Sequence, residues 1–524
     1  MADDHQRQGP EIQDARAGCG GAGAAGRGGG AHGLTPPRAR VPLPARALSL
    51  VLAATLLARL PSLWEPRWAH NEGLLAAVAT EMIGGQRLYL DVWGNQQPLA
   101  YDFMALVLSV THAWHPGMQL ILAVQVLAST TFVYLVARRL EAQAALTALT
   151  FGLVAALPVV EGDLQGTELI GMPLLLGGIL CGIGGGPVRA VAAGVLLVLA
   201  GLVQPTYLLD ALCVPWYVTL SGRPLRVLPV LGGAAAAALA AFVALQLSGI
   251  WEAWRSLLGS EWRELQWANG GAELAPISLL LRLAPLGVGL FAGLRIGIEQ
   301  RSPAARLLGA WLPLAVIGAV LSPRGFMHQS LEILPPLALM LGLWLRPVLV
   351  APVLVGIVLM LQAAMFLPRL EMFALARWAL PETSYGTAFG WTALPGYYKD
   401  WYDHAVGVTD WHQYSAKFPG RAAQVEDLAS GIKVEGRLEV WGDQPWLYVV
   451  SGRGQTGRYI ARDEAYRLEP DSDARTISAI RAQRPEYLIL IDKAPPALSR
   501  QLSSQYDRLR FIPAPWPVYG LHSG

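Results

Sequence analysis

The chain has 524 residues, of which 53% are hydrophobic and only 15% are charged. Soluble globular proteins carry about 25% charged residues, so this composition excludes an ordinary water-soluble fold. The formal net charge is +2 and the sequence holds no basic stripe, which argues against a nucleic-acid partner. Cys19, Cys181 and Cys213 are too few and too scattered for a disulfide framework or a metal-ligand cluster.

Residues 1–42 are rich in glycine, alanine and arginine and hold almost no large apolar side chain. Such a segment buries too little surface to offset the entropy of ordering it, so we expect it to be disordered. Arg38, Arg40 and Arg46 stand close to the first apolar run, and the positive-inside bias therefore favours a cytoplasmic N-terminus.

Residues 43–367 consist of apolar runs separated by short polar clusters. A bilayer core of about 30 Å takes roughly 20 helical residues. The pattern predicts an α-helical polytopic membrane domain of about 11 to 13 transmembrane helices. The candidate spans lie near 45–63, 97–113, 117–137, 143–160, 169–182, 190–204, 206–220, 227–249, 276–294, 307–321, 331–346 and 347–367.

Arginines between the later spans indicate the orientation of the chain. Counting backward from the last span places Arg138, Arg189, Arg223 and Arg346 on one side, which the positive-inside bias makes cytoplasmic. The segments that then face outward are the loops at 161–168, 250–275 and 322–329 and the C-terminal domain.

Counting forward from a cytoplasmic N-terminus places Arg138 on the extracytoplasmic side, in conflict with the backward count. One segment between 64 and 137 is therefore not a full span. The 97–113 run is short and carries Asp102, so it is the best candidate for a partial or re-entrant segment.

Two outward loops contain amphipathic helical patterns. The apolar residues of the first recur at helical spacing from Leu75 to Ile83, and this helix is expected to lie at the membrane interface. In the second, Trp251, Trp254 and Trp262 share one face, which is how an interfacial helix seats tryptophans at headgroup level. Stacking on a sugar is the alternative role for these tryptophans.

Residues 368–524 resemble ordinary soluble protein and are predicted to form a small extracytoplasmic α/β domain. The expected strands are 438–441, 446–450 and 487–491, and the expected helices are 475–482 and 497–506. The segment contains no phosphate loop, zinc spacing or nucleophile elbow.

Acidic side chains next to membrane helices are candidates for function because they are costly to place there. Glu72 opens the first amphipathic helix, Asp91 follows it, and Glu161, Asp163 and Glu168 flank the second outward loop. A carboxylate at this boundary can act as general base for a sugar hydroxyl, or bind a divalent cation that neutralises a phosphate leaving group. The alternative is that Glu72 and Glu168 only stabilise helix N-termini.

A third outward loop offers basic groups. Arg324 and His328 precede the apolar run that begins at Leu331. Arginine pairs with phosphate oxygens in a fork geometry, and histidine adds a donor or a proton. The pair is a candidate for holding a lipid phosphate, while a simple headgroup anchor is the alternative role for Arg324.

Three stretches together resemble the GT-C superfamily of membrane glycosyltransferases, in its family 39-like branch of protein mannosyltransferases and aminoarabinose transferases. HNEGLLAAVATEMIGGQRLYLDVWGNQQPLAYDF, from His70 to Phe103, is similar to the family's first external loop. VVEGDLQGTELIG resembles its second acidic loop, and RGFMHQSLEILPPLAL its late basic segment. The resemblance covers residues 45–367 in layout.

The resemblance implies an inverting transfer of sugar from a polyprenyl-phosphate carrier to a glycan, lipid or protein acceptor, at the outer face of a bacterial plasma membrane. It implies Glu72 as base and Asp163 and Glu168 as further acidic groups. Asn71 stands where the family has its catalytic aspartate, and Gln96 or Gln97 stands in place of its basic residue. The implied substrate-binding residues are His70, Asn71, Asp91, Gln97, Tyr101, Arg324 and His328.

Two other functions stay open at this point. A non-catalytic relative that binds or hands on lipid-linked glycans is favoured by Asn71, with the C-terminal domain as a partner-binding module. A transporter lacks support because the sequence shows no internal repeat. The sequence does not identify the donor sugar, the acceptor or a requirement for a divalent cation such as Mg²⁺ or Mn²⁺.

Overall fold

The computed structural model describes residues 43–259, 303–321, 327–344, 394–418, 422–431, 436–452, 454–469, 471–509 and 516–522. Residues Pro44–Gly524 form one compact unit. Several predictions fall outside the described residues: the disordered segment 1–42, the spans 276–294 and 347–367, Trp262, Arg324, Arg346 and the domain boundary after residue 367.

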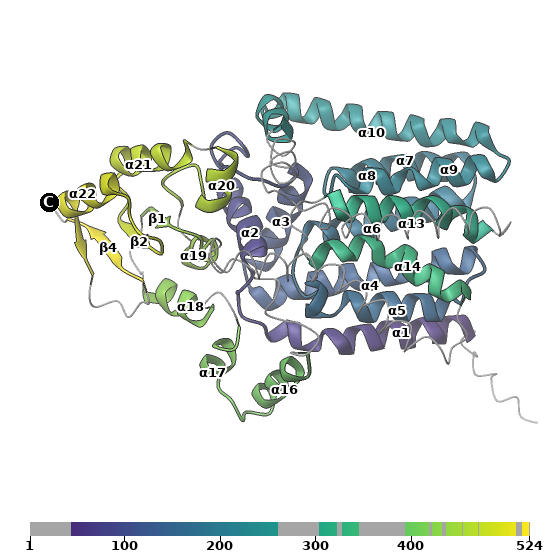
Figure 1. Cartoon of the computed structure of the whole chain (residues 1–524), viewed down its shortest axis with the longest axis horizontal. Coiled ribbons are helices and arrows are strands. Elements are labelled where there is room, and N and C mark those ends of the chain that lie inside the picture. The colour runs from purple at the N-terminus through teal and green to yellow at the C-terminus, as the bar shows by residue number, and fades with distance from the viewer. Residues whose placement is uncertain are drawn as a thin grey trace, which may run out of the picture. The chain divides into compact units, whose positions relative to one another are not determined.

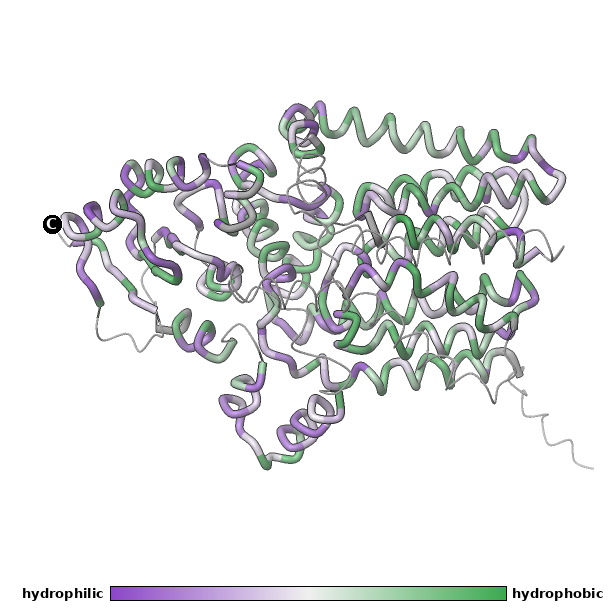
Figure 2. The backbone as a smooth tube through the Cα atoms, in the orientation of Figure 1, coloured by the Kyte–Doolittle hydropathy of each residue, from purple (hydrophilic) through white to green (hydrophobic). Residues whose placement is uncertain are grey.

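Apolar helices follow the predicted runs, and Figure 2 shows hydrophobic residues along most of their length. Four candidate spans are long and apolar enough to cross a membrane: Ala45–Trp64, His115–Arg139, Thr167–Gly184 and Pro224–Leu247. A helical membrane protein is thereby confirmed. The apolar helices are α1 (Leu43–Arg59), α4 (His115–Arg139), α5 (Ala144–Ala155), α6 (Thr167–Gly184), α7 (Pro187–Gly201), α8 (Tyr207–Ala211), α9 (Cys213–Leu220), α10 (Val227–Leu247), α13 (Pro303–Leu321) and α14 (Ser330–Trp344), with the short 3₁₀ helices η1 (Leu60–Trp64), η2 (Pro158–Val160), η3 (Pro224–Arg226) and η4 (Met327–Gln329).

The two ends of this helix bundle differ in charge. α4 and α6 run in the same direction, since Arg139 near the end of α4 donates from Nη1 to Leu180 O near the end of α6 at 3.0 Å. We call the end that carries Arg138, Arg139, Arg189, Arg223 and Arg226 the arginine end. We call the opposite end, which carries Glu65, Glu72, Glu161 and Glu168, the acidic end.

Helix α3 (Pro98–Thr111) explains why the forward and backward counts of transmembrane spans disagree. It begins next to Trp254, which follows α10 at the acidic end and donates to Gln97 at 2.9 Å. It ends next to α4, where a Cβ on Gly117 would lie 3.1 Å from Thr111. Both ends of α3 therefore lie at the acidic end, and 14 residues, about 21 Å of helix, cannot cross and return.

Helix α2 (His70–Ile83) is a helix as predicted, but it does not lie half-exposed at an interface. Its residues from Glu72 to Ala79 are all buried. α3 packs on it, and so does α19 (Trp446–Ser451) from the C-terminal part of the chain. The apolar face that suggested membrane contact is covered by protein instead.

The C-terminal part contains a four-stranded sheet with the strand order β1-β2-β4-β3. β1 (Leu438–Trp441) runs parallel to β2 (Tyr487–Leu490), while β4 (Val518–Leu521) is antiparallel to both β2 and β3 (Tyr506–Arg508). The predicted strands at 438–441 and 487–491 are confirmed, as are the helices now seen as α21 (Ser472–Gln483) and α22 (Pro496–Gln505).

The predicted strand at 446–450 is wrong, because this segment is helix α19. Four consecutive apolar side chains, Trp446 to Val449, are buried on different sides of the helix, and such a run has no alternation to separate strand from helix. The remaining described helices are α16 (Leu394–Ala405), α17 (Trp411–Ser415), α18 (Ala422–Gly431) and α20 (Arg462–Leu468). In Figure 1 the colour follows the described elements from the N-terminus to the C-terminus.

Candidate active site

The loop between α5 and α6 organises the acidic end. Gly162 is required here, because a Cβ on it would lie 2.2 Å from Ala155 O. The buried guanidinium of Arg59, at the end of α1, donates from Nη1 to Gly162 O and from Nη2 to Gln119 Oε1 at 3.5 Å. The loop is thus held by a buried cation. Its three polar residues, Glu161, Asp163 and Gln165, belong to two different clusters.

The first cluster surrounds Glu72, in the first turn of α2. Its side chain is buried, and Oε1 accepts a hydrogen bond from the backbone N–H of Gln165 at 3.2 Å. Nε2 of His115 lies 3.8 Å from Oε2. His115 Nδ1 is 3.0 Å from the carbonyl oxygen of Glu65 and must donate to it, because a carbonyl oxygen only accepts. The other ring nitrogen, Nε2, is the one that faces Glu72. The predicted base therefore has a histidine next to it.

Asp163 lies in the same region and is fully buried. Burial raises its pKa to about 6, against the opposing effects of a hydrogen bond with Glu65 and the charge of Arg59. Two carboxyl groups form such a bond only when one holds a proton. Glu65 also accepts from the Tyr397 hydroxyl and from Trp68 Nε1, at 3.3 Å for the latter. Asp163 thus belongs to a packed polar network.

In the second cluster, His328 from the loop at 322–329 contacts acidic residues of the loop at 161–168. Nδ1 of His328, in η4, lies 2.6 Å from Glu161 Oε2, and Nε2 lies 3.7 Å from Glu168 Oε1. Burial alone would lower the pKa of His328, but the charges of Glu168 and Glu161 raise it to about 9. His328 is therefore a cation at neutral pH, held between two carboxylates.

Residues next to Glu72 point elsewhere, since consecutive helical residues are about 100° apart. Asn71 is exposed. His70 Nδ1 lies 3.3 Å from Asp443 Oδ1, in the turn between β1 and α19. The structure therefore separates Asn71 and His70 from the cluster around Glu72.

The remaining predicted residues stabilise the loop before α3. Tyr101 Oη accepts from the backbone N–H groups of Asn95 and Gln96, at 3.1 and 3.2 Å. Gln97 is buried and bonded to Trp254. Asp91 forms an ion pair with Arg87 at 2.9 Å in the preceding turn. These three residues are spread along the loop and do not join Glu72.

Sequence reasoning missed His115, Glu65 and Gln165 as members of the Glu72 cluster. A polar residue directly at the end of an apolar run, such as Glu65 or His115, was the only available signal. Within the described part of the chain, no three His, Cys, Asp or Glu side chains are grouped so as to hold a metal ion.

No protein-family model matches the chain, and no curated protein matches it in sequence. In structure, the chain is similar to ArnT from Cupriavidus metallidurans, crystallised bound to undecaprenyl phosphate. The TM-score is 0.55 at 14% sequence identity, and the match covers 91% of this chain and 98% of ArnT. An identity this low shows the fold alone: the chain has a fold like that of ArnT, which agrees with the predicted GT-C-like architecture.

Proposed function

We propose that the chain transfers a sugar from a polyprenyl-phosphate carrier to an acceptor at the extracytoplasmic face of a bacterial plasma membrane. The fold supports this, because its similarity to ArnT extends over 91% of the chain. The gathering of carboxylates at one end of the bundle supports it further, since acidic groups beside membrane helices are costly unless they serve a function.

The observation that carries the proposal is the position of Glu72. One carboxylate oxygen is fixed by Gln165 N–H at 3.2 Å, and the other lies 3.8 Å from His115 Nε2. In the proposed reaction Glu72 removes the proton of the acceptor hydroxyl as its oxygen attacks the anomeric carbon. The bond from that carbon to the carrier phosphate breaks on the opposite face, so the sugar is transferred with inversion.

His328 is the candidate for the leaving phosphate. His328 is a cation that contacts the carboxylates of Glu161 and Glu168. A phosphate oxygen can replace either carboxylate as its charge-assisted hydrogen-bond partner. Arg324, four residues before it, is proposed to act with it. Asp163 is proposed to act indirectly, by positioning the loop that presents Gln165, and a divalent cation stays a prediction.

The test compares Glu72→Gln with Glu81→Gln. Both glutamates are buried in α2, but Glu81 accepts from Gln455 N at 2.8 Å and lies away from the cluster. We expect Glu72→Gln to lower transfer by about 10²–10⁴-fold, the usual contribution of a general base, and Glu81→Gln to retain it. The measurement is the cell-surface glycan profile of a deletion strain complemented with each variant. Full complementation by Glu72→Gln would remove Glu72 from the mechanism.

A non-catalytic function is the second candidate, and one observation favours it. Asn71, where the resembling family has an aspartate, is exposed, while Glu72 is buried and already bonded. Such a protein would bind lipid-linked glycans in the same fold without transfer. Asn71→Asp distinguishes the two. A protein that lost transfer because it lacks this aspartate gains turnover, whereas an enzyme that uses Glu72 keeps the turnover it already has.

A further inference from the structure

A pocket of about 60 Å³ opens at the arginine end, away from the candidate active site. Its walls come from the end of α6, the start of α7, the end of α9, the turn η3 and the start of α10. α6 has 18 residues, which places its two ends about 27 Å apart. The pocket and Glu168, in the first turn of α6, are therefore separate sites.

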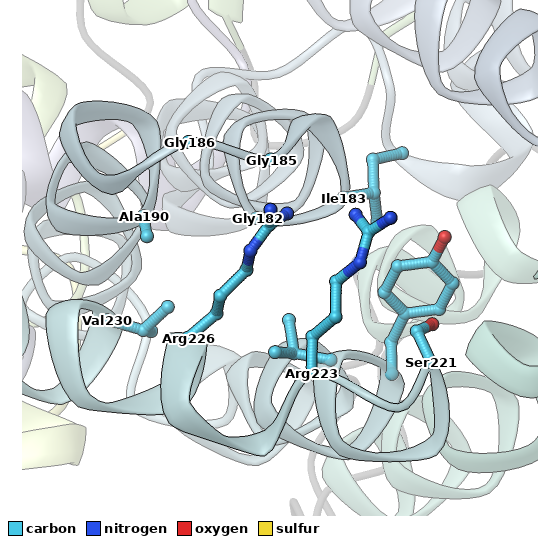
Figure 3. Close-up of a pocket in the computed structure, with 11 residues that line it drawn as sticks. Gly182, Ile183, Gly185, Gly186, Ala190, Ser221, Arg223, Arg226 and Val230 are labelled. Atoms are coloured by element: carbon cyan, nitrogen blue, oxygen red, sulfur yellow. The ribbon is translucent and has the colours of Figure 1, made fainter.

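Two arginines give the pocket its charge. Figure 3 shows the side chains of Arg223 and Arg226 projecting side by side toward Gly182 and Gly185, with Ser221 close by. Among the residues that the structure describes, neither guanidinium makes a hydrogen bond or an ion pair, and no acidic side chain lines the pocket. Two positive charges thus face the same space, and no described residue acts as their counter-ion.

The opposite wall is a glycine turn that leaves room for a ligand. Gly185 and Gly186 have φ of +73° and +91°, which side-chain-bearing residues rarely adopt. A Cβ on Gly185 would lie 3.0 Å from Arg226 Nη1, so a larger residue would push the guanidinium aside. Gly186 also caps the N-terminus of α7, whose partial positive charge adds to that of the arginines.

From these features we infer that the pocket binds the phosphate of an anionic phospholipid headgroup. Arginine matches phosphate oxygens with paired N–H donors, and basic pockets between membrane helices suit such headgroups. The positive-inside bias places this end at the cytoplasmic leaflet.

The surroundings favour a lipid over free phosphate. α10 is the least buried of the four long candidate spans. Next to the pocket, Leu225 and Leu228 are 79% and 63% exposed, and Val188 at the start of α7 is 81% exposed. These apolar side chains give acyl chains a surface directly beside the two arginines.

The test uses the full chain in detergent after delipidation, with phosphatidylglycerol, phosphatidylcholine or inorganic phosphate as the added probe. Native mass spectrometry measures bound lipid, and thermal unfolding measures stabilisation. An arginine near an anionic surface contributes about fivefold, so Arg223→Gln with Arg226→Gln should weaken phosphatidylglycerol binding roughly 30-fold. The control double variant, Arg138→Gln with Arg189→Gln, removes the same charge from the same end outside the pocket and should bind nearly as the wild type does.

Equal losses in the two double variants, or unchanged binding in the pocket variant, would overturn the proposal. Stabilisation by inorganic phosphate alone, lost in the pocket variant, would assign the site to free phosphate and overturn the lipid assignment. Equal unfolding temperatures of all variants in phosphatidylcholine show that the fold is intact. None of these readouts depends on glycosyl transfer.

Discussion

The indole of Trp446 occupies the space that a side chain on Gly73 would need, because a Cβ built on Gly73 would lie 2.8 Å from the ring. Trp446 Nε1 donates to Ala69 O at 2.8 Å, and the ring stands edge-on to His115 with 5.8 Å between centroids. One tryptophan of the C-terminal part therefore fixes the start of α2 and the histidine beside Glu72.

Gly73→Ala should destabilise the protein by about 1–3 kcal/mol, the cost of overpacking a buried contact. The change should lower the thermal unfolding temperature of the purified protein. Gly232→Ala is the matched control, since a Cβ on Gly232 in α10 meets nothing within 4 Å. Equal unfolding temperatures of the two variants would contradict the proposed contact.

His328 should make stability depend on alkaline pH. Its folded pKa of about 9 lies above the ordinary 6.5, so its contribution is complete below pH 6.5 and is lost as the pH rises through 9. The shift corresponds to about 3 kcal/mol. His328→Gln should therefore be less stable than the wild type at pH 6, with the gap closing by pH 10. A gap that stays constant over this range, in unfolding curves at each pH, would show that the histidine is not protonated.

Glu439 in β1 should also make the folded protein less stable as the pH rises. Burial raises its pKa to about 8, opposed by hydrogen bonds from the backbone of Gly457 and Thr456. The stability linked to this proton is present below pH 4.5 and lost as the pH rises through 8, by an amount on the order of 5 kcal/mol.

Glu439→Gln keeps an acceptor for Gly457 N–H but removes the charge. It should therefore unfold at a higher temperature than the wild type above pH 8, with little difference near pH 4.5. Unfolding scans across this range measure the difference. A wild type that is the more stable of the two above pH 8 would mean that the ionised carboxylate is well solvated.

Tyr101→Phe should destabilise the loop before α3. The substitution removes the oxygen that accepts from Asn95 N–H and Gln96 N–H, at a cost of about 1–3 kcal/mol if these groups stay buried. Limited proteolysis within 87–97 should accelerate. Tyr466→Phe, at a tyrosine that is 53% exposed, is the control and should leave the digestion pattern unchanged.

Local patterns predicted much of the fold. Apolar run length placed α4, α6 and α10 within a few residues, and the arginines correctly indicated that one early segment does not cross. The burial of α2 could not be predicted, because the residue that covers it, Trp446, comes 377 positions after its bonding partner Ala69. An amphipathic face shows that a helix is covered on one side, but not by what.

The candidate site was predictable only in parts. The loops that carry Glu72, Glu168 and His328 were identified from charges at the ends of apolar runs. The pairing of His328 with Glu161, across 167 residues, depends on how η4 packs against η2 in the α5–α6 loop. The sequence also predicted Asn71 as a substrate-binding residue next to the base Glu72, whereas helical geometry exposes Asn71 and buries Glu72.

The course of α3 also constrains how the protein is made. Both of its ends lie at the acidic end, which is the extracytoplasmic end in the proposed orientation. In that orientation the whole stretch between α1 and α4 has to be exported by the translocon before α4 can insert. Its 14 residues are mostly apolar, yet the helix is too short to stop that export. Lengthening α3 by two turns should therefore create a stop-transfer sequence. Every later helix would then be inverted in the membrane, including α6, which carries Glu168.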